Sequence, residues 1–189
     1  GPKLITLPLM VGEPEDAVRA VLDDSFAVQE SRYQFDPTVE ANRVISAFGV
    51  DGEGNSLDLS TVEQYWEGQP VTLVVSLGAI PEIKGLSVDD AKKTLSSKGL
   101  VGSTSEALHD WSDDVPTGMV IGFKSLPEGT VATTGTELQL IVSDGIEQVT
   151  VPDVVGKTWG EAKALLEAAG FKIVFRDGPS QALAIFPDS

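Results

Sequence analysis

An internal repeat is the feature that most constrains the fold of this chain. Five residues, two of them glycines, recur in register 71 positions further along the sequence. A repeat of this kind predicts one small structural unit used several times, because each copy must form the same turns and the same helix. The repeated residues are Pro81, Gly85, Ala91, Leu95 and Gly99 in one copy and Pro152, Gly156, Ala162, Leu166 and Gly170 in the next.

The repeat divides the 189 residues into three copies of unequal length. We place the first repeat at 3–78, the second at 79–145 and the third at 146–189. The first repeat diverges, because Phe26 stands where a helix-ending glycine is expected. The third is incomplete, since the chain ends at Ser189 before a closing strand, and we expect its sheet to lack a partner. Units of about 70 residues bury a limited core and are marginally stable alone.

Each copy is predicted to carry one capped helix. In the second repeat Ser87 is followed three residues later by Asp90, and in the third Thr158 is followed by Glu161, which is the spacing of a capping box. Glycine just after each helix favours a left-handed C-terminal residue. The apolar faces are Val88, Ala91 and Leu95 in one helix and Ala162, Leu165, Leu166 and Ala169 in the other.

Alternating apolar residues at 71–75 and 138–142, with glycines on either side, predict a strand near the end of each complete copy. The first repeat is longer in its middle, where 44–50 and 57–61 flank the turn-rich stretch 51–56. This pattern predicts an inserted hairpin. The linkers between copies are short, so we expect the units to follow one another in a line with limited freedom.

The stretch Val151-Pro152-Asp153-Val154-Val155-Gly156, with the helix after it and Gly170-Phe171, resembles the start of a PASTA domain. The second repeat adds the remaining motifs of the pattern. These are Gly118-Met119-Val120, Pro127-Glu128-Gly129, Gly135-Thr136 and Leu140-Ile141-Val142-Ser143-Asp144-Gly145. The resemblance implies an α+β fold of tandem small domains, each with one helix packed on a three-stranded sheet.

The same resemblance implies a function outside the bacterial membrane. It suggests the sensor or localisation region of a membrane-anchored serine/threonine kinase, located at the extracellular face of the cell membrane. The expected partners are peptidoglycan fragments (muropeptides) or a lipid-linked cell-wall precursor, with self-association on binding. The acidic, lysine-poor composition suggests an actinobacterium. The alternatives are the C-terminal PASTA region of a penicillin-binding protein and a structural spacer or dimerisation rod without its own ligand site.

Charge limits the partners that such a chain can bind. The formal net charge is −16, which repels nucleic acid and anionic membrane surfaces. The third repeat is the least acidic, with 4 basic and 6 acidic side chains. The absence of cysteine excludes disulfides and thiolate metal sites. Gly1-Pro2 is typical of a cleaved tag, so we infer nothing from the lack of a leader or anchor.

Catalytic motifs are absent, since the chain has one histidine, no cysteine and no glycine-rich phosphate loop. We therefore expect a non-enzymatic fragment without a cofactor. His109, Asp110, Asp113 and Asp114 have the donor types of a metal site, but their position before Pro116 favours a turn. The alternating acids from Asp51 to Asp58 resemble a calcium loop that lacks its required glycine and glutamate, which favours a hairpin tip and no metal.

The third repeat holds the candidate ligand-binding residues. Trp159 is predicted at the first turn of the helix, on the face opposite its apolar stripe, where an indole could stack on a sugar ring. Cations nearby could pair with peptide carboxylates. The indole could equally pack against a neighbouring unit. The candidate residues are Lys157, Trp159, Lys172 and Arg176.

Overall fold

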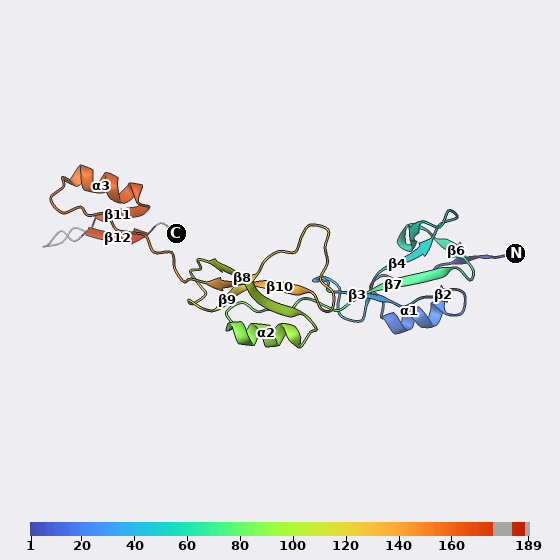
Figure 1. Cartoon of the computed structure of the whole chain (residues 1–189). Helices are drawn as coiled ribbons and strands as arrows, with labels where there is room; N and C mark the ends of the chain where they lie inside the picture. Colours follow the sequence, from blue (N-terminus) through green and yellow to red (C-terminus); the bar gives the residue numbers. More distant parts are fainter. Residues whose placement is uncertain (176–182, 188–189) are drawn as a thin grey trace. The chain divides into compact units, whose positions relative to one another are not determined.

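The computed structural model describes residues 1–175 and 183–187 and shows a mixed α+β protein (Figure 1). The chain forms two compact units, Gly1–Gly145 and Ile146–Ser189. The first unit contains the first and second repeats. The second unit contains the third repeat.

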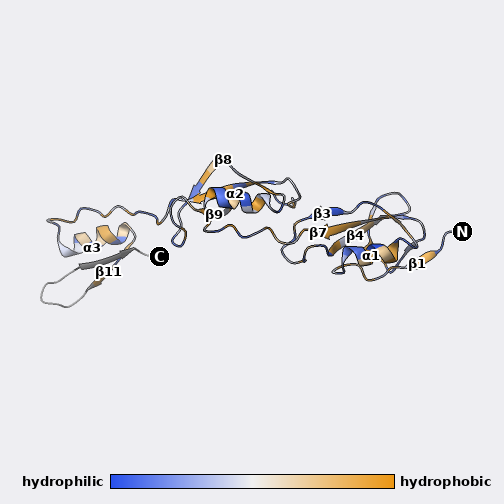
Figure 2. Ribbon diagram, turned by 90° about the horizontal axis from the view of Figure 1, so that it is seen from below, coloured by the Kyte–Doolittle hydropathy of each residue, from blue (hydrophilic) through white to orange (hydrophobic). Residues whose placement is uncertain are grey.

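In the first repeat, one helix covers one face of a five-stranded sheet. The strand order is β2-β7-β4-β5, and β3 also pairs with β7. Val18 and Leu22 of the helix are buried in one core with the apolar residues of strand β7, which Figure 2 shows in orange. A separate antiparallel ribbon, β1–β6, lies beside this core. The elements are β1 Leu4–Thr6, α1 Glu15–Leu22, β2 Ala27–Val28, β3 Arg32–Gln34, β4 Val44–Val50, β5 Ser56–Asp58, β6 Gln64–Trp66 and β7 Pro70–Ser76.

The predicted hairpin in the first repeat is confirmed, because β4 and β5 pair antiparallel around the turn-rich stretch 51–56. Its second arm is shorter than predicted. Residues Leu59–Thr61 form a 3₁₀ helix, η1, and not a continuation of the strand. The Asp58 carboxylate accepts a hydrogen bond from the Ser60 backbone N–H, which caps η1 and ends the strand.

The second repeat has one helix on a three-stranded sheet, as predicted. Strand β10 lies in the centre, parallel to β8 and antiparallel to β9. The Ser87 hydroxyl accepts the Asp90 backbone N–H, and Gly99 takes a left-handed φ of 78° just after the helix. The elements are α2 Val88–Ser96, β8 Val101–Asp110, β9 Val120–Phe123 and β10 Glu137–Ser143.

The third repeat contains helix α3 (Trp159–Ala168) and strands β11 (Phe171–Phe175) and β12 (Leu183–Pro187). Two expectations are wrong here. Leu165 is 39% exposed, so the buried stripe of α3 narrows to Ala162 and Leu166. Strand β11 has a partner, because β12 pairs with it antiparallel. Residues 183–187 are extended here, and an open strand edge accepts any extended segment that reaches it.

The first and second repeats are closed by the same buried hydrogen bonds. The Ser76 hydroxyl donates to the Val39 carbonyl (2.6 Å) and accepts the Gly78 N–H (2.9 Å). In the second repeat the Ser143 hydroxyl donates to the Val115 carbonyl (2.7 Å) and accepts the Gly145 N–H (2.9 Å). Both serines are buried, so this bonding satisfies their hydroxyl groups away from water.

These closures align the two repeats and give Phe35 and Trp111 equivalent positions. After Phe35, the Asp36 N–H donates to the Gly78 carbonyl at 3.0 Å. After Trp111, the Ser112 N–H donates to the Gly145 carbonyl at 2.8 Å. The residue before each aromatic side chain accepts a backbone bond in the same way, Gln34 from Leu77 and Asp110 from Asp144.

The two equivalent aromatic residues have different surroundings. Phe35 is 7% exposed and belongs to the core of the second repeat, with Ile83, Leu95 and Leu138. Its backbone N–H donates to the Ala132 carbonyl at 2.8 Å. Trp111 is 50% exposed, and its backbone N–H donates to the Asp110 carboxylate. Phe35 therefore joins the first repeat to the core of the second.

We expect Phe35→Ala to lower the free energy of unfolding by about 3 kcal/mol, because it removes a buried ring and leaves a cavity. Urea denaturation of the full chain, followed by circular dichroism, measures this change. Trp111→Ala is the matched control at the equivalent position and should cost less than about 1 kcal/mol, because its side chain is half exposed. Equal losses in the two variants would contradict the role assigned to Phe35.

Candidate functional site

A complete capping box fixes the start of α3, where Trp159 is the first helical residue. The Glu161 carboxylate accepts hydrogen bonds from the Thr158 N–H (2.9 Å) and hydroxyl (3.0 Å). The Thr158 hydroxyl accepts the Glu161 N–H at 3.4 Å. The backbone and hydroxyl bonds from Thr158 lower the pKa of Glu161. The Thr158 and Glu161 side chains therefore both stabilise the first turn of α3.

Three of the four predicted ligand residues lie in the described part of the third repeat. Lys157 and Trp159 flank the capping residue, and the Trp159 side chain is 43% exposed. Lys172 is exposed on β11. Within the described part of the chain, neither lysine has an ion-pair partner, whereas Lys163 on α3 lies 3.8 Å from Glu167. Arg176 falls outside the described residues.

The acidic loop of the second repeat distributes its carboxylates among separate partners. Asp114 pairs with Lys84 at 2.6 Å, and this bond, with a second from Ser112, lowers the pKa of Asp114. His109 Nδ1 lies 2.9 Å from an Asp144 carboxylate oxygen. Across 1–175 and 183–187, no three histidine or acidic side chains gather in a group that could hold a metal ion.

The acidic hairpin of the first repeat also uses its carboxylates locally. One Asp51 oxygen accepts the N–H groups of Glu53 (2.9 Å) and Asn55 (2.8 Å), which closes the tip of the hairpin. The bonds from Asn55, followed by those from Glu53 and Gly54, lower the pKa of Asp51. This geometry is that of a hairpin turn.

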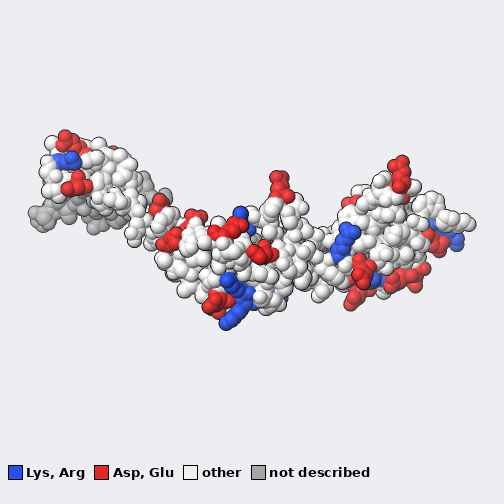
Figure 3. Space-filling view, viewed as in Figure 1, with Lys and Arg blue, Asp and Glu red and all other residues white. Residues whose placement is uncertain are grey.

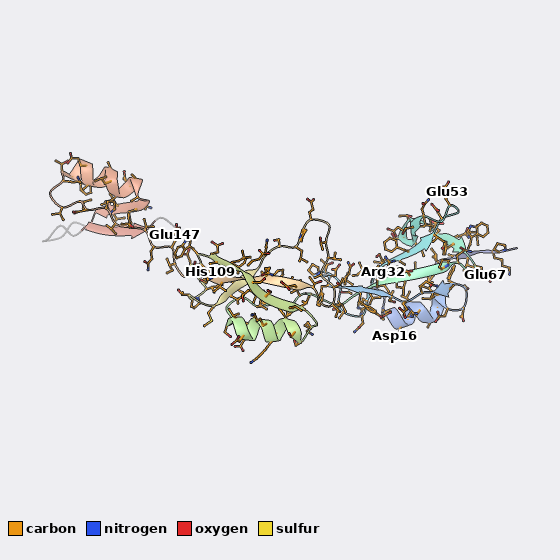
Figure 4. All side chains as sticks on the ribbon, viewed as in Figure 1. Asp16, Arg32, Glu53, Glu67, His109 and Glu147 are labelled. Carbon is orange, nitrogen blue, oxygen red and sulfur yellow. The ribbon has the colours of Figure 1, made fainter. Side chains whose placement is uncertain are left out.

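The sequence did not predict a groove of about 360 Å³ in the first repeat. Arg32 stands at this groove on β3, and Figure 4 labels it on the sheet, away from Glu53 at the hairpin tip. The groove depends on how β4 and β7 separate, which no local sequence pattern records. Acidic side chains are spread over the visible face of the first and second repeats (Figure 3).

Taken together, the fold defines a tandem array of small α+β modules. A family model described as the PASTA domain matches residues 78–144 and 149–181. The chain belongs to the PASTA domain family. PASTA domains are non-catalytic modules. None of the helices in the described part of the chain has the length and apolar character needed to cross a bilayer.

Similar proteins include bacterial serine/threonine kinases. One, named "Probable serine/threonine-protein kinase PknB", from Corynebacterium glutamicum, is 32% identical over 109 residues, covering 56% of this chain and 17% of the kinase. Serine/threonine-protein kinase PknB of Mycolicibacterium smegmatis is 38% identical over 104 residues, 53% of this chain and 15% of the kinase. The chain thus matches about a sixth of the length of these relatives.

Among solved structures, the three-PASTA-domain of a Ser/Thr kinase from Staphylococcus aureus is 20% identical, with a TM-score of 0.38. The match covers 88% of this chain and 80% of the Staphylococcus aureus chain. The entire extra-cellular region of the Ser/Thr kinase PrkC from Staphylococcus aureus is 19% identical, with a TM-score of 0.28, covering 79% of this chain and 50% of that chain.

We expect Thr158→Ala to destabilise the first turn of α3 by about 1 kcal/mol, because it removes the cap. Hydrogen exchange of the amides at 159–162 measures this effect. The matched control is Ser87→Ala, which should speed exchange in α2 and leave α3 unchanged. Unchanged exchange at 159–162 in Thr158→Ala would contradict the capping role.

The capping box should also respond to pH. Because the pKa of Glu161 is lowered in the folded state, its stabilising effect is present above the ordinary glutamate value of about 4.3 and is lost as the pH falls through the lowered pKa. The ¹³Cα shifts of 159–162 should therefore lose helical character in acid. Glu161→Gln has no titrating carboxyl, so its shifts at these positions should not follow this titration.

Proposed function

We propose that this chain is part of the extracellular sensor and localisation region of a membrane serine/threonine kinase. The observation that carries the proposal is the match of its PASTA repeats to kinases over a limited share of the kinase length. Catalysis would then reside elsewhere in the whole protein. The relatives named above are kinases, which favours this class over a penicillin-binding protein.

The ligand in this proposal is a peptidoglycan fragment or a lipid-linked cell-wall precursor. A half-exposed indole at Trp159 offers an apolar face to a sugar ring. Lys157 and Lys172, which have no ion-pair partner in the described residues, are available for peptide carboxylates. The third repeat also has the smallest excess of acidic side chains, which reduces repulsion of an anionic ligand.

Binding of this kind would act by concentrating kinase molecules. A ligand that localises or clusters the extracellular repeats raises the effective concentration of the attached kinase domains. No movement within the repeats is required for this effect.

A second function is favoured by one observation. Phe35 lies in the core of the second repeat, which restricts motion between the first two repeats. Restricted motion of this kind suits a structural spacer without its own ligand site.

Titration of a muropeptide into the ¹⁵N-labelled chain tests the ligand site. We expect saturable amide shifts around Lys157, Trp159 and Lys172, and at least a several-fold loss of affinity in Trp159→Ala. Lys163→Ala is the matched control, because Lys163 is an exposed lysine of the same helix that lies near Glu167. An absence of shifts in the third repeat at millimolar muropeptide would remove this site.

A further inference from the structure

A buried tyrosine separates two strands of the first repeat. The β4–β7 pairing extends to Phe48 opposite Thr72 and goes no further. At the next positions the Tyr65 hydroxyl takes the place of a direct strand bond, accepting the Val50 N–H (2.8 Å) and donating to the Pro70 carbonyl (3.1 Å). Tyr65 is buried and stacks on Phe26, with ring centroids 5.7 Å apart, so the hydroxyl is firmly placed.

A glycine makes this insertion possible. A Cβ atom at Gly49 would lie 2.5 Å from the Tyr65 hydroxyl oxygen, closer than atoms can approach. Residue 49 must therefore lack a side chain for the tyrosine to reach between the strands. The position of Tyr65 in the buried core therefore determines how the groove forms. Its lining comes from β3, β4, β7 and the β4–β5 hairpin, namely Arg32, Phe48, Gly49, Val50, Gly54, Ser56, Pro70 and Thr72.

Arg32 differs from the other described arginines. Arg19 donates to the Gln29 carbonyl and to Ser31, and its guanidinium lies 4.0 Å from Glu15. Arg43 donates to the Gly12 carbonyl and pairs with Glu40. The Arg32 side chain has no hydrogen-bond or ion-pair partner among residues 1–175 and 183–187. It remains unpaired in a repeat with 13 acidic and 4 basic side chains.

Acidic residues close to the groove in sequence do not serve Arg32. The Asp51 carboxylate closes the hairpin tip, and the Asp58 carboxylate caps η1. The hydrogen bonds from Asn55 lower the pKa of Asp51, and those from Ser60 lower the pKa of Asp58. Among the described residues that line the groove, Arg32 is the one with a cationic side chain.

We propose that this groove binds the free carboxylate of a short peptide. A guanidinium matches a carboxylate with two parallel hydrogen bonds. A volume of about 360 Å³ suits a ligand of a few residues at most. The strong excess of negative charge in the repeat favours a monoanion over a polyanion or a phosphate dianion. Ser56 and Thr72, which also line the groove, carry hydroxyl groups that can hydrogen-bond to the peptide. This site is separate from the third repeat and does not depend on the function proposed above.

The test uses the full ¹⁵N-labelled chain and N-acetyl-alanyl-alanine as the probe, with its C-terminal amide as the uncharged comparison. We expect saturable shifts at Arg32, Gly49, Val50 and Gly54 with the acid and none with the amide. Arg32→Gln should weaken binding about tenfold or more. Arg32→Lys should bind less well than the native chain, because it keeps the charge and loses the planar fork.

Lys3→Gln is the matched control, since it removes one positive charge from the same repeat and does not touch the groove. It should bind as the native chain does. Circular dichroism of Arg32→Gln should be native, because the side chain has no partner to lose.

Three outcomes would overturn the inference. Equal shifts with the acid and the amide would exclude recognition by the guanidinium. Equal affinity for inorganic phosphate would show a general anion site. Shifts confined to Lys157 and Lys172 would remove the groove while leaving the proposed ligand site of the third repeat intact. Conversely, groove binding by this probe would stand even if muropeptide failed to shift the third repeat.

Discussion

The structure of residues 1–145 depends on the burial of Phe35 in the core of the second repeat. A repeat of this size has too little apolar surface to be highly stable alone. Phe35 adds a side chain from the first repeat to that core, and its N–H bonds to the Ala132 carbonyl. The core of the second repeat is thereby completed by a side chain of the first repeat, and both repeats belong to one compact unit. Trp111, at the equivalent position of the second repeat, has neighbours with the same backbone hydrogen bonds, but its own side chain is half exposed.

Local features of the fold could be predicted from the sequence. The caps at Ser87 and Thr158 depend on residues three positions apart, and the left-handed glycines after the helices depend on one residue each. The alternation of apolar residues that predicts strands β7 and β10 is also local. These predictions succeed because neighbouring residues determine such features whatever lies further along the chain.

Features that depend on distant residues could not be predicted. Periodicity gave Leu165 a buried position, but a helix buries only the face that another element covers. The site of Phe35 requires Ala132, far away in the sequence, and an inserted hairpin shifts the spacing between the repeats. The groove at Arg32 depends on a tyrosine from β6 entering between β4 and β7. No spacing rule connects these residues before the sheet forms.

The serine closure has a consequence for how such chains evolve. In each of the first two repeats it uses only residues of that repeat, Ser76 with Val39 and Gly78, or Ser143 with Val115 and Gly145. Gly78 and Gly145 have nearly the same φ, 83° and 79°. Recombination just after Gly78 or Gly145 can therefore exchange or duplicate a repeat and leave the serine closure of the preceding repeat intact. A repeat that follows Gly78 must accommodate Phe35 and Leu77, because both side chains pack against the core of the second repeat, and this requirement limits which repeats can be exchanged.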